Sequence, residues 1–530
     1  MPANPSDPHP PAGPSPGGPP LRGADAGDAG RPFGDLDEAR RDELHAAVLE
    51  AAQSLGCSHA EVRTEQLRSQ GLRLRDGHLE TAADDTERGI GVRVVYDGVI
   101  GFAATVATDV DAVVALASQA VHGARVCARA APTRIELAPQ PSLGRVRWVA
   151  PHALDPVEVP LADKVSLLAE WSHRLLRSSS VDHVGASVLS VTEDKHYADL
   201  NGTVALQRRV RVHPAVEAVG LGGGGSGFET MRTLAPPVGR GWEYLLGTGW
   251  DWDAELAELP ELLAAKLVAP SVEPGSYDLV VDPTNLWLTI HESIGHATEL
   301  DRAMGYEAAY AGTSFATPDR LGTLRYGSPL LEVTGDRTTP FGLATVAVDD
   351  EGVVAQSFDL VREGTLVGYQ LDRAIAGTAG LGSSNGCAFA DSPLHVPMQR
   401  MANVSLASAP EVGPSTEELI GGVDRGIYVV GDKSWSIDMQ RYNFQFTGQR
   451  FFAIEHGEVT GQVKDVAYQA TTTEFWGSLE AVGGTATYRL GGAFNCGKGQ
   501  PGQVAPVSHG CPSVLVRSVN VLNARAEAGR

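Results

Sequence analysis

An alternation of apolar and polar residues over positions 60–105 limits most strongly what this chain can fold into. Successive side chains on a β-strand point to opposite faces of the sheet, so this pattern indicates strands with one covered face. The pattern is interrupted at Asp76-Gly77 and at Asp97-Gly98, and Asp-Gly pairs favour the tight turns that join antiparallel strands. We therefore expect an antiparallel meander in this segment.

Helical patterns flank the meander on both sides. Apolar residues recur at helical spacing over residues 35–56, and Gly56 provides a C-terminal stop. A second helix is expected over about residues 109–128, with Thr108 as its N-cap. A helix, a meander and a helix make a small α+β domain, which we place at residues 35–130.

The remaining segments differ in composition. Residues 1–34 are rich in Pro, Gly, Ala and Asp and are expected to be a disordered tail, because they have little apolar surface to bury. Residues 131–265 are expected to hold a Pro-rich linker and a middle α+β region, with a hairpin turn at Asn201-Gly202. Residues 266–530 contain many short apolar segments and frequent glycines, which predicts a large β-rich domain with few helices. The expected fold class is α+β.

Charge and composition argue against some classes of function. The net charge is −23, from 42 Lys and Arg against 65 Asp and Glu, and no segment is strongly basic. Binding to nucleic acid or to an anionic membrane is therefore not expected, because both need a local positive field. No apolar run is long enough for a transmembrane helix. The five cysteines are scattered and form no CxxC pair, which favours a reducing, cytoplasmic location.

The segment "TIHESIGHATEL" at residues 289–300 is the strongest candidate for a catalytic site. His291 and Glu292 begin the H-E-x-x-H pattern of zinc hydrolases, but the second histidine is His296, one residue later than that pattern requires. Residues five apart on a regular α-helix are separated by about 140°, so the two imidazoles would diverge. They can converge if the helix breaks at Gly295 or if a π-bulge adds a residue to one turn, and the sequence leaves both alternatives open.

The residue types in this segment suit metal-assisted hydrolysis. His291 and His296 would bind Zn²⁺, and Glu292 would be the general base that takes a proton from zinc-bound water. In the alternative interpretation, one histidine belongs to the core and the other to the surface. A third ligand is needed, and spacing does not choose among the candidates. These are Glu299, Cys387, His395, His456, Cys496, His509 and Cys511.

Four longer segments resemble the TldD/PmbA family of metallopeptidases, and the first of them resembles its TldD branch. They are "HESIGHATELD", "SNGCAFADSPLHVPMQRMANV", "GGVDRGIYVVGDKSWSIDMQRYNFQFTGQRFFAIEHGE" and "GGAFNCGKGQPGQVAPVSHGCPSV". The resemblance implies a zinc metallopeptidase in which His291, His296 and Cys496 match the metal ligands and Glu292 matches the catalytic acid/base. It also implies a partner, either a TldE/PmbA-like sister subunit or a second copy of the chain. The two subunits would enclose a chamber that admits unfolded or flexible peptides.

The sequence offers further candidates for roles at the site. Tyr442, His509 and Arg441 lie in these segments and are candidates for polarising the scissile carbonyl, although packing within a strand is favoured for Tyr442 and Arg441. Strands beside the metal could hold a peptide by edge pairing, which would give broad specificity. Two other functions are alternatives: a non-catalytic peptide-binding or scaffold subunit, and a zinc amidase that acts on a modified peptide or a small molecule.

Overall fold

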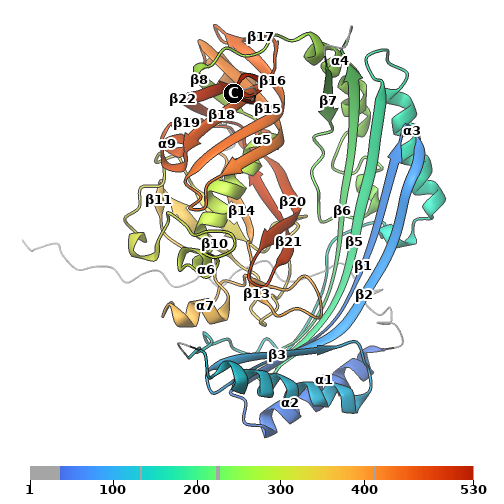
Figure 1. Ribbon diagram of the computed structural model, residues 1–530, viewed down its shortest axis with the longest axis vertical. Coiled ribbons are helices and arrows are strands. Elements are labelled where there is room, and N and C mark those ends of the chain that lie inside the picture. The colour runs from blue at the N-terminus through green and yellow to red at the C-terminus, as the bar shows by residue number, and fades with distance from the viewer. Residues whose placement is uncertain (1–35, 132–133, 223–226, 410–411, 529–530) are drawn as a thin grey trace, which may run out of the picture.

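The structure is a computed structural model that describes residues 36–131, 134–222, 227–409 and 412–528 (Figure 1). The predicted tail at residues 1–34 lies outside the described residues. Helices pack against extensive, mostly antiparallel sheets, which confirms the predicted α+β class. Within the described residues, no helix has the length and apolar character needed to cross a membrane.

The predicted meander forms one side of a long, curved sheet (Figure 1). Its strands turn at Asp76-Gly77 and Asp97-Gly98, where all four residues have φ angles between 49° and 81°. Two successive residues with positive φ make the tight type I′ turn, so both predicted hairpins are confirmed. The sheet has seven strands, in the order β3-β2-β1-β5-β6-β4 with β7 paired to β6. Their bounds are β1 His59–Arg75, β2 His78–Tyr96, β3 Val99–Thr105, β4 Arg145–Val149, β5 His183–Asp199, β6 Val204–Leu221 and β7 Phe228–Arg232.

The middle hairpin belongs to the same sheet. Strands β5 and β6 turn at Asn201-Gly202, as predicted, and β5 pairs with β1 in antiparallel register. This pairing crosses the predicted boundary at residue 130, so strands assigned to two regions share one sheet. The domain boundaries themselves stay a prediction. Strand β4, within the segment predicted as a linker, pairs in parallel with β6.

Among the described residues, four helices lie against this sheet, and two of them are the helices predicted at residues 35–56 and at about 109–128. The start of the second helix differs by one residue, because Asp109 and not Thr108 is the N-cap. The carboxylate of Asp109 accepts a hydrogen bond from the backbone N–H of Ala112 at 2.8 Å, the bond that a cap residue supplies to the first turn. The helices are α1 Glu38–Ser54, α2 Val110–Cys127, α3 Leu161–Leu175 and α4 Trp252–Val268.

The C-terminal half is built around a second sheet of seven strands. Their order is β15-β8-β22-β18-β16-β17, with β19 paired to β22, and β16 also pairs with β15. Strands β15, β8, β22, β18 and β16 therefore form a closed ring, in which each strand has a neighbour on both sides. The strands are β8 Gly275–Val281, β15 Arg425–Ile437, β16 Asn443–Glu455, β17 Glu458–Val463, β18 Val466–Thr471, β19 Leu479–Val482 and β22 Val514–Asn523.

A buried helix, α5 (Pro283–Ile290), packs against this ring and leads to the histidine pair. Its side chains Leu286 and Ile290 belong to the same apolar core as Val281 and Phe446 of the sheet. Smaller sheets lie beside it, in the orders β11-β10-β9-β14, β12-β13 and β20-β21. Their strands are β9 Val333–Asp336, β10 Ser357–Arg362, β11 Thr365–Leu366, β12 Ala388–Phe389, β13 Met398–Gln399, β14 Asn403–Leu406, β20 Arg489–Lys498 and β21 Gln503–Cys511. The remaining α-helices are α6 Leu300–Ala303, α7 Arg373–Thr378, α8 Thr416–Gly421, α9 Thr472–Gly477 and α10 Ala524–Ala528.

Buried ion pairs join the long sheet to the C-terminal half. Lys195 Nζ lies 2.8 Å from both carboxylate oxygens of Asp350, and Arg93 Nη1 lies 2.7 Å from Glu351 Oε1. All four side chains are buried. Removing one partner would leave an uncompensated charge inside the protein, at a cost of about 3–5 kcal/mol. These contacts hold the sheet against the half of the chain that carries the histidine pair.

Candidate metal centre

The helical segment that carries the histidine pair contains a π-helical turn between the two histidines. The α-helical part of α5 ends at Ile290, and residues His291–Gly295 form a π-helical turn. The backbone N–H of His296 donates to the carbonyl of His291, five residues earlier. A π turn holds one more residue than an α turn, so histidines five apart can share a face. Of the two alternatives that the sequence leaves open, the structure has the π-bulge.

Gly295 contributes to this turn through its lack of a side chain. Its φ and ψ are −52° and −60°, which are ordinary helical values. The helix-break alternative, in which Gly295 would adopt an unusual backbone conformation, is therefore not the one found. A β-carbon at this position would lie 2.6 Å from Met401 Sδ, so the absence of a side chain is what lets Met401 pack against the turn.

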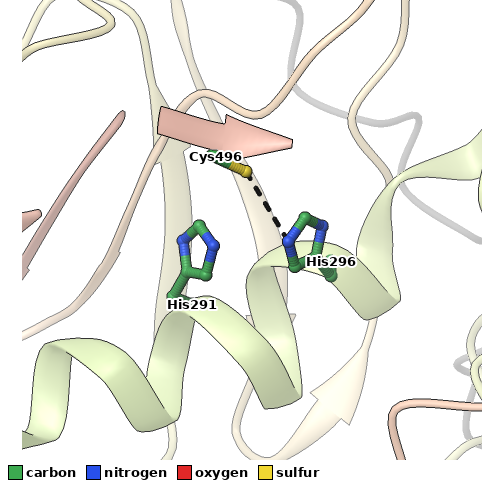
Figure 2. A group of neighbouring side chains, drawn as sticks. All are labelled: His291, His296 and Cys496. Atoms are coloured by element: carbon green, nitrogen blue, oxygen red, sulfur yellow. Dashed lines mark hydrogen bonds between the residues drawn. The ribbon is translucent and has the colours of Figure 1, made fainter. Parts of the chain in front are cut away.

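Cys496 lies over the two histidines. One potential ligand atom from each of His291, His296 and Cys496 lies within 4.8 Å of the other two. Figure 2 shows both imidazoles rising from one face of the helical segment towards the thiol on β20. All three side chains are buried. The chain thus brings together the three residues that the family resemblance implies, across 200 positions of sequence.

The separation of one pair of donor atoms matches the spacing of ligands around a tetrahedral zinc ion. Cys496 Sγ lies 3.6 Å from His296 Nε2. With zinc–nitrogen bonds of about 2.0–2.1 Å and a zinc–sulfur bond of about 2.3 Å, tetrahedral geometry places nitrogen and sulfur ligands about 3.6 Å apart. Two imidazoles and a thiolate leave the fourth position free, as in catalytic zinc sites. The donor set therefore fits zinc without rearrangement of this pair.

His509 orients the first histidine. His509 Nδ1 lies 2.8 Å from the carbonyl oxygen of Val404, which can only accept, so Nδ1 carries the proton. Burial, and then the neighbouring His291, hold the pKa of His509 well below its usual value, so the ring is neutral and its Nε2 has a free lone pair. That Nε2 lies 2.7 Å from His291 Nδ1, which must then be the donor. The relay leaves His291 Nε2 unprotonated and ready to bind a metal.

Glu299 does the same for the second histidine. His296 Nδ1 lies 2.8 Å from Glu299 Oε2, so His296 donates from Nδ1 and keeps the Nε2 lone pair for a metal. Burial alone would raise the pKa of Glu299, but Lys498 and His296 hold it well below the usual value. Lys498 Nζ, fully buried, donates to Glu299 Oε1 at 3.0 Å and to Asp301 Oδ1 at 2.8 Å. Since Lys498 is on the strand of Cys496, this contact ties the thiol strand to the histidine helix.

The surroundings of both ligand types favour the forms that bind metal. Burial lowers the pKa of His291 and of His296, which favours neutral imidazoles. Burial alone would raise the pKa of the Cys496 thiol, but His296 and the Arg400 guanidinium more than offset it, so its pKa is lowered. A thiolate and neutral imidazoles are the ligands that zinc binds.

Glu292 lies beside these ligands and is held by an arginine. Its Oε2 accepts a hydrogen bond from Arg441 Nη1 at 2.6 Å, and both side chains are largely buried. Arg441 belongs to the loop between β15 and β16. Packing within a strand, the interpretation favoured for Arg441 from sequence, is therefore wrong, because a turn directs its guanidinium into the site.

Two family models match the chain. The model described as the PmbA/TldA metallopeptidase C-terminal domain matches residues 274–523, and the model described as PmbA/TldA metallopeptidase domain 1 matches residues 60–124. The chain belongs to the PmbA/TldD family of metallopeptidases. As a member of this family it is a metal-dependent hydrolase of peptide bonds.

Relatives of this PmbA/TldD-family chain cover most of its length. It is 29% identical over 467 residues to a metalloprotease from Methanothermobacter thermautotrophicus, a match that spans 87% of this chain and 95% of the relative. It is 23% identical over 273 residues to a zinc metalloprotease TldD homolog from Saccharolobus solfataricus, spanning 51% of this chain and 57% of the relative. TldE from Thermococcus kodakarensis matches with a TM-score of 0.68 at 17% identity, covering 90% of this chain and 99% of that one. At that identity the likeness shows a shared fold.

The other candidate ligands of this PmbA/TldD-family chain lie in different surroundings. The half-exposed imidazole of His395 pairs with Asp391, and the exposed imidazole of His456 pairs with Asp424. Burial raises the pKa of the Cys387 thiol to about 12, which disfavours the thiolate that metals bind. Three candidates contact other groups: Cys511 contacts the Pro283 carbonyl, Glu299 contacts His296 and His509 contacts His291.

The three candidates for polarising a carbonyl make different contacts in the structure. The hydroxyl of Tyr442 pairs with Thr473 Oγ1 at 3.0 Å. Both ring nitrogens of His509 are already used in contacts with Val404 and His291, so the ring can orient His291. Arg441 alone of the three contacts Glu292. No pattern in the sequence distinguishes these residues, because their roles depend on contacts across the fold.

Proposed function

We propose that this chain is a zinc-dependent peptidase of the TldD type, with His291, His296 and Cys496 as zinc ligands and Glu292 as general base. The observation that carries the proposal is the convergence of two oriented imidazoles and a thiol beside a buried carboxylate. The zinc in the name of the Saccharolobus solfataricus relative supports the choice of metal. The intact ligand set and general base support the active type of subunit.

In the proposed reaction the zinc ion would supply Lewis acidity and the chain would supply the group that transfers protons. A zinc ion in this site would supply Lewis acidity, which lowers the pKa of water towards neutrality and polarises a carbonyl. The chain contributes Glu292, which lies beside the ligands and can accept the proton of the attacking water. The same carboxyl group can then deliver the proton to the departing amine. His509 and Glu299 keep the ligand imidazoles in the correct tautomer throughout.

A small groove lies next to the strand that carries Cys496. Its volume is about 200 Å³, and it lies between the long sheet and β20, with Trp287, Phe494 and Asn495 in its wall. Asn495 directly precedes Cys496 in the chain. Within the described residues β20 pairs with no strand other than β21, and the carbonyl of Cys496 accepts a hydrogen bond from Arg400. We propose that an extended substrate pairs with the remaining groups of the second edge, beside Asn495. Backbone pairing of this kind would accept flexible peptides of many sequences.

We also propose that the working enzyme contains a second subunit, either a TldE/PmbA-like sister or another copy of this chain. The proposal rests on the family resemblance and on the fold shared with a TldE. A cytoplasmic location is proposed with it, on the basis of the unpaired cysteines.

Two observations weigh against the alternative functions. A scaffold subunit needs no general base, whereas Glu292 is held beside the ligands by a buried arginine. An amidase acting on small molecules would not need the edge of β20 that has no strand partner among the described residues. Both alternatives therefore explain less of the site than a peptidase does.

Cleavage of flexible peptides by the zinc-loaded chain tests the proposal. Wild type and Glu292→Gln are loaded with zinc and incubated with a library of unstructured peptides, alone and with a TldE/PmbA-like subunit. We expect cleavage by wild type, and a loss of at least about 100-fold in Glu292→Gln at unchanged zinc content. Near-normal cleavage by Glu292→Gln would contradict the assigned role. Absence of cleavage under both conditions would contradict the peptidase proposal.

A further inference from the structure

Arg441 occupies a backbone conformation that side-chain-bearing residues rarely adopt. Its φ angle is +62°, in the left-handed region, where a β-carbon is crowded by the following carbonyl. Non-glycine residues persist there when surrounding contacts fix them, and such positions concentrate at functional sites. The conformation therefore raises the question of which contacts hold Arg441, and for what purpose.

Hydrogen bonds on both sides fix the loop of Arg441. The Asp438 carboxylate accepts from the backbone N–H groups of Gln440, Tyr442 and Asn443 at 2.8–3.0 Å. The hydroxyl of Thr472 donates to the carbonyl of Arg441 at 2.9 Å. The loop thus imposes the left-handed conformation and aims the Arg441 side chain at the metal ligands.

The guanidinium is only partly used by the contacts it makes. Nη1 donates to Glu292 Oε2 at 2.6 Å, and the side chain is 14% exposed. Nε is buried and has no hydrogen-bond partner in the described part of the chain. An arginine carries five N–H donors, and a buried donor without a partner costs about 1–3 kcal/mol. A charged donor group with spare N–H bonds therefore lies beside the general base.

We propose that Arg441 is a catalytic residue, which donates a hydrogen bond to the carbonyl oxygen of the scissile peptide as that oxygen becomes negative. The inference rests on the proposed peptidase function of the same site. Attack of a water oxygen on the carbonyl carbon moves the π electron pair to the carbonyl oxygen, while Glu292 takes a proton from the water. When the pair returns, the C–N bond breaks, its electrons stay on nitrogen, and the amine takes the proton from Glu292. Arg441 stabilises the negative oxygen between these two events.

An alternative role for Arg441 is to orient Glu292 and nothing more. The two roles differ in what happens once the carboxylate is replaced. A residue that acts only through Glu292 loses its effect in Glu292→Gln. A residue that contacts the substrate oxygen keeps its effect on the binding of a tetrahedral anion in both backgrounds.

The test uses a phosphinic peptide, in which a tetrahedral anion replaces the scissile amide, and reads binding by calorimetry. The zinc-loaded full chain is compared as wild type, Arg441→Met, Arg441→Lys, Glu292→Gln and the double variant Glu292→Gln/Arg441→Met. We expect Arg441→Met to weaken binding by about 10- to 100-fold in both backgrounds, and Arg441→Lys to restore part of the loss. Arg362→Met, at a more exposed arginine (61% exposed) paired with Asp359, is the matched control and should bind as wild type does.

These outcomes distinguish the proposed role of Arg441 from the proposed function of the whole site. Equal binding by wild type and Arg441→Met, with folding verified by thermal melting and by Arg441→Lys, would overturn the catalytic role of Arg441. A loss that disappears in the Glu292→Gln background would overturn it in favour of orientation. A wild-type chain that holds zinc but neither cleaves peptides nor binds the phosphinic peptide would instead overturn the proposed function.

Discussion

The hydrogen bond between His509 and His291 makes a quantitative prediction about metal affinity. In His509→Phe a planar aromatic ring is retained, so the stacking on Trp287, at 6.2 Å and 11° between planes, can persist. The N–H of His291, buried with no other partner among the described residues, loses its acceptor at 2.7 Å. An unpaired buried donor costs about 1–3 kcal/mol, and the loss of a group that orients a metal ligand typically weakens affinity by about 10- to 100-fold. We therefore expect zinc to bind His509→Phe about 10- to 100-fold more weakly.

Competition with a chromophoric chelator measures this affinity on the purified full chain. His509→Gln offers an amide oxygen as acceptor and should recover most of the lost affinity. His395→Phe is the matched control, because the imidazole of His395 is half-exposed and pairs with Asp391. If folded His509→Phe binds zinc with an affinity within twofold of wild type, the hydrogen bond from His291 to His509 does not orient His291 for the metal.

Three further predictions concern packing, buried charge and the metal itself. Gly295→Ala places a β-carbon 2.6 Å from Met401 Sδ and should lower the free energy of unfolding by about 1–3 kcal/mol in urea titrations, with partial recovery in Gly295→Ala/Met401→Ala. Lys498→Met leaves Glu299 without its buried ammonium partner at 3.0 Å and should lower that free energy by about 3–5 kcal/mol. Zinc at 100 times its dissociation constant should stabilise the fold by about 2.7 kcal/mol in thermal melts, an effect that Cys496→Ser should largely remove.

Each of these has an outcome that would contradict it. A wild-type unfolding curve for Gly295→Ala would mean that Met401 can move aside without cost. A stability equal to wild type in Lys498→Met would mean that the acidic side chains around it are held by other charges. Equal stabilisation by zinc in wild type and Cys496→Ser would place the thiol outside the site.

Local sequence patterns predicted the elements whose causes are local. The Asp76-Gly77 and Asp97-Gly98 turns form because aspartate and glycine tolerate the positive φ angles that a two-residue hairpin needs. The predicted helices form within a few residues of their expected bounds. The Thr108 prediction failed by one residue, because two adjacent residues both suited a cap and only the folded helix selects between them.

The candidate site was predictable only in part. The spacing of His291 and His296 required a distortion, and helix geometry alone could not choose between a break and a π-bulge. Cys496 is 200 positions away from His296, so no periodicity connects them, and the family resemblance alone singled Cys496 out from the other candidates. Arg441 was misjudged because its side chain reaches the site through a left-handed turn, which the residue type does not signal. Long-range contacts of this kind are properties of the fold and leave no local pattern.

X-ray absorption at the zinc edge, on the purified chain and on Cys496→Ser, tests the central claim most directly. We predict about one zinc per chain in wild type, with one sulfur ligand at about 2.3 Å and nitrogen ligands at about 2.0–2.1 Å. In Cys496→Ser the sulfur contribution should disappear and zinc content should fall. A wild-type spectrum without sulfur, or an unchanged sulfur signal in Cys496→Ser, would contradict a site made by His291, His296 and Cys496.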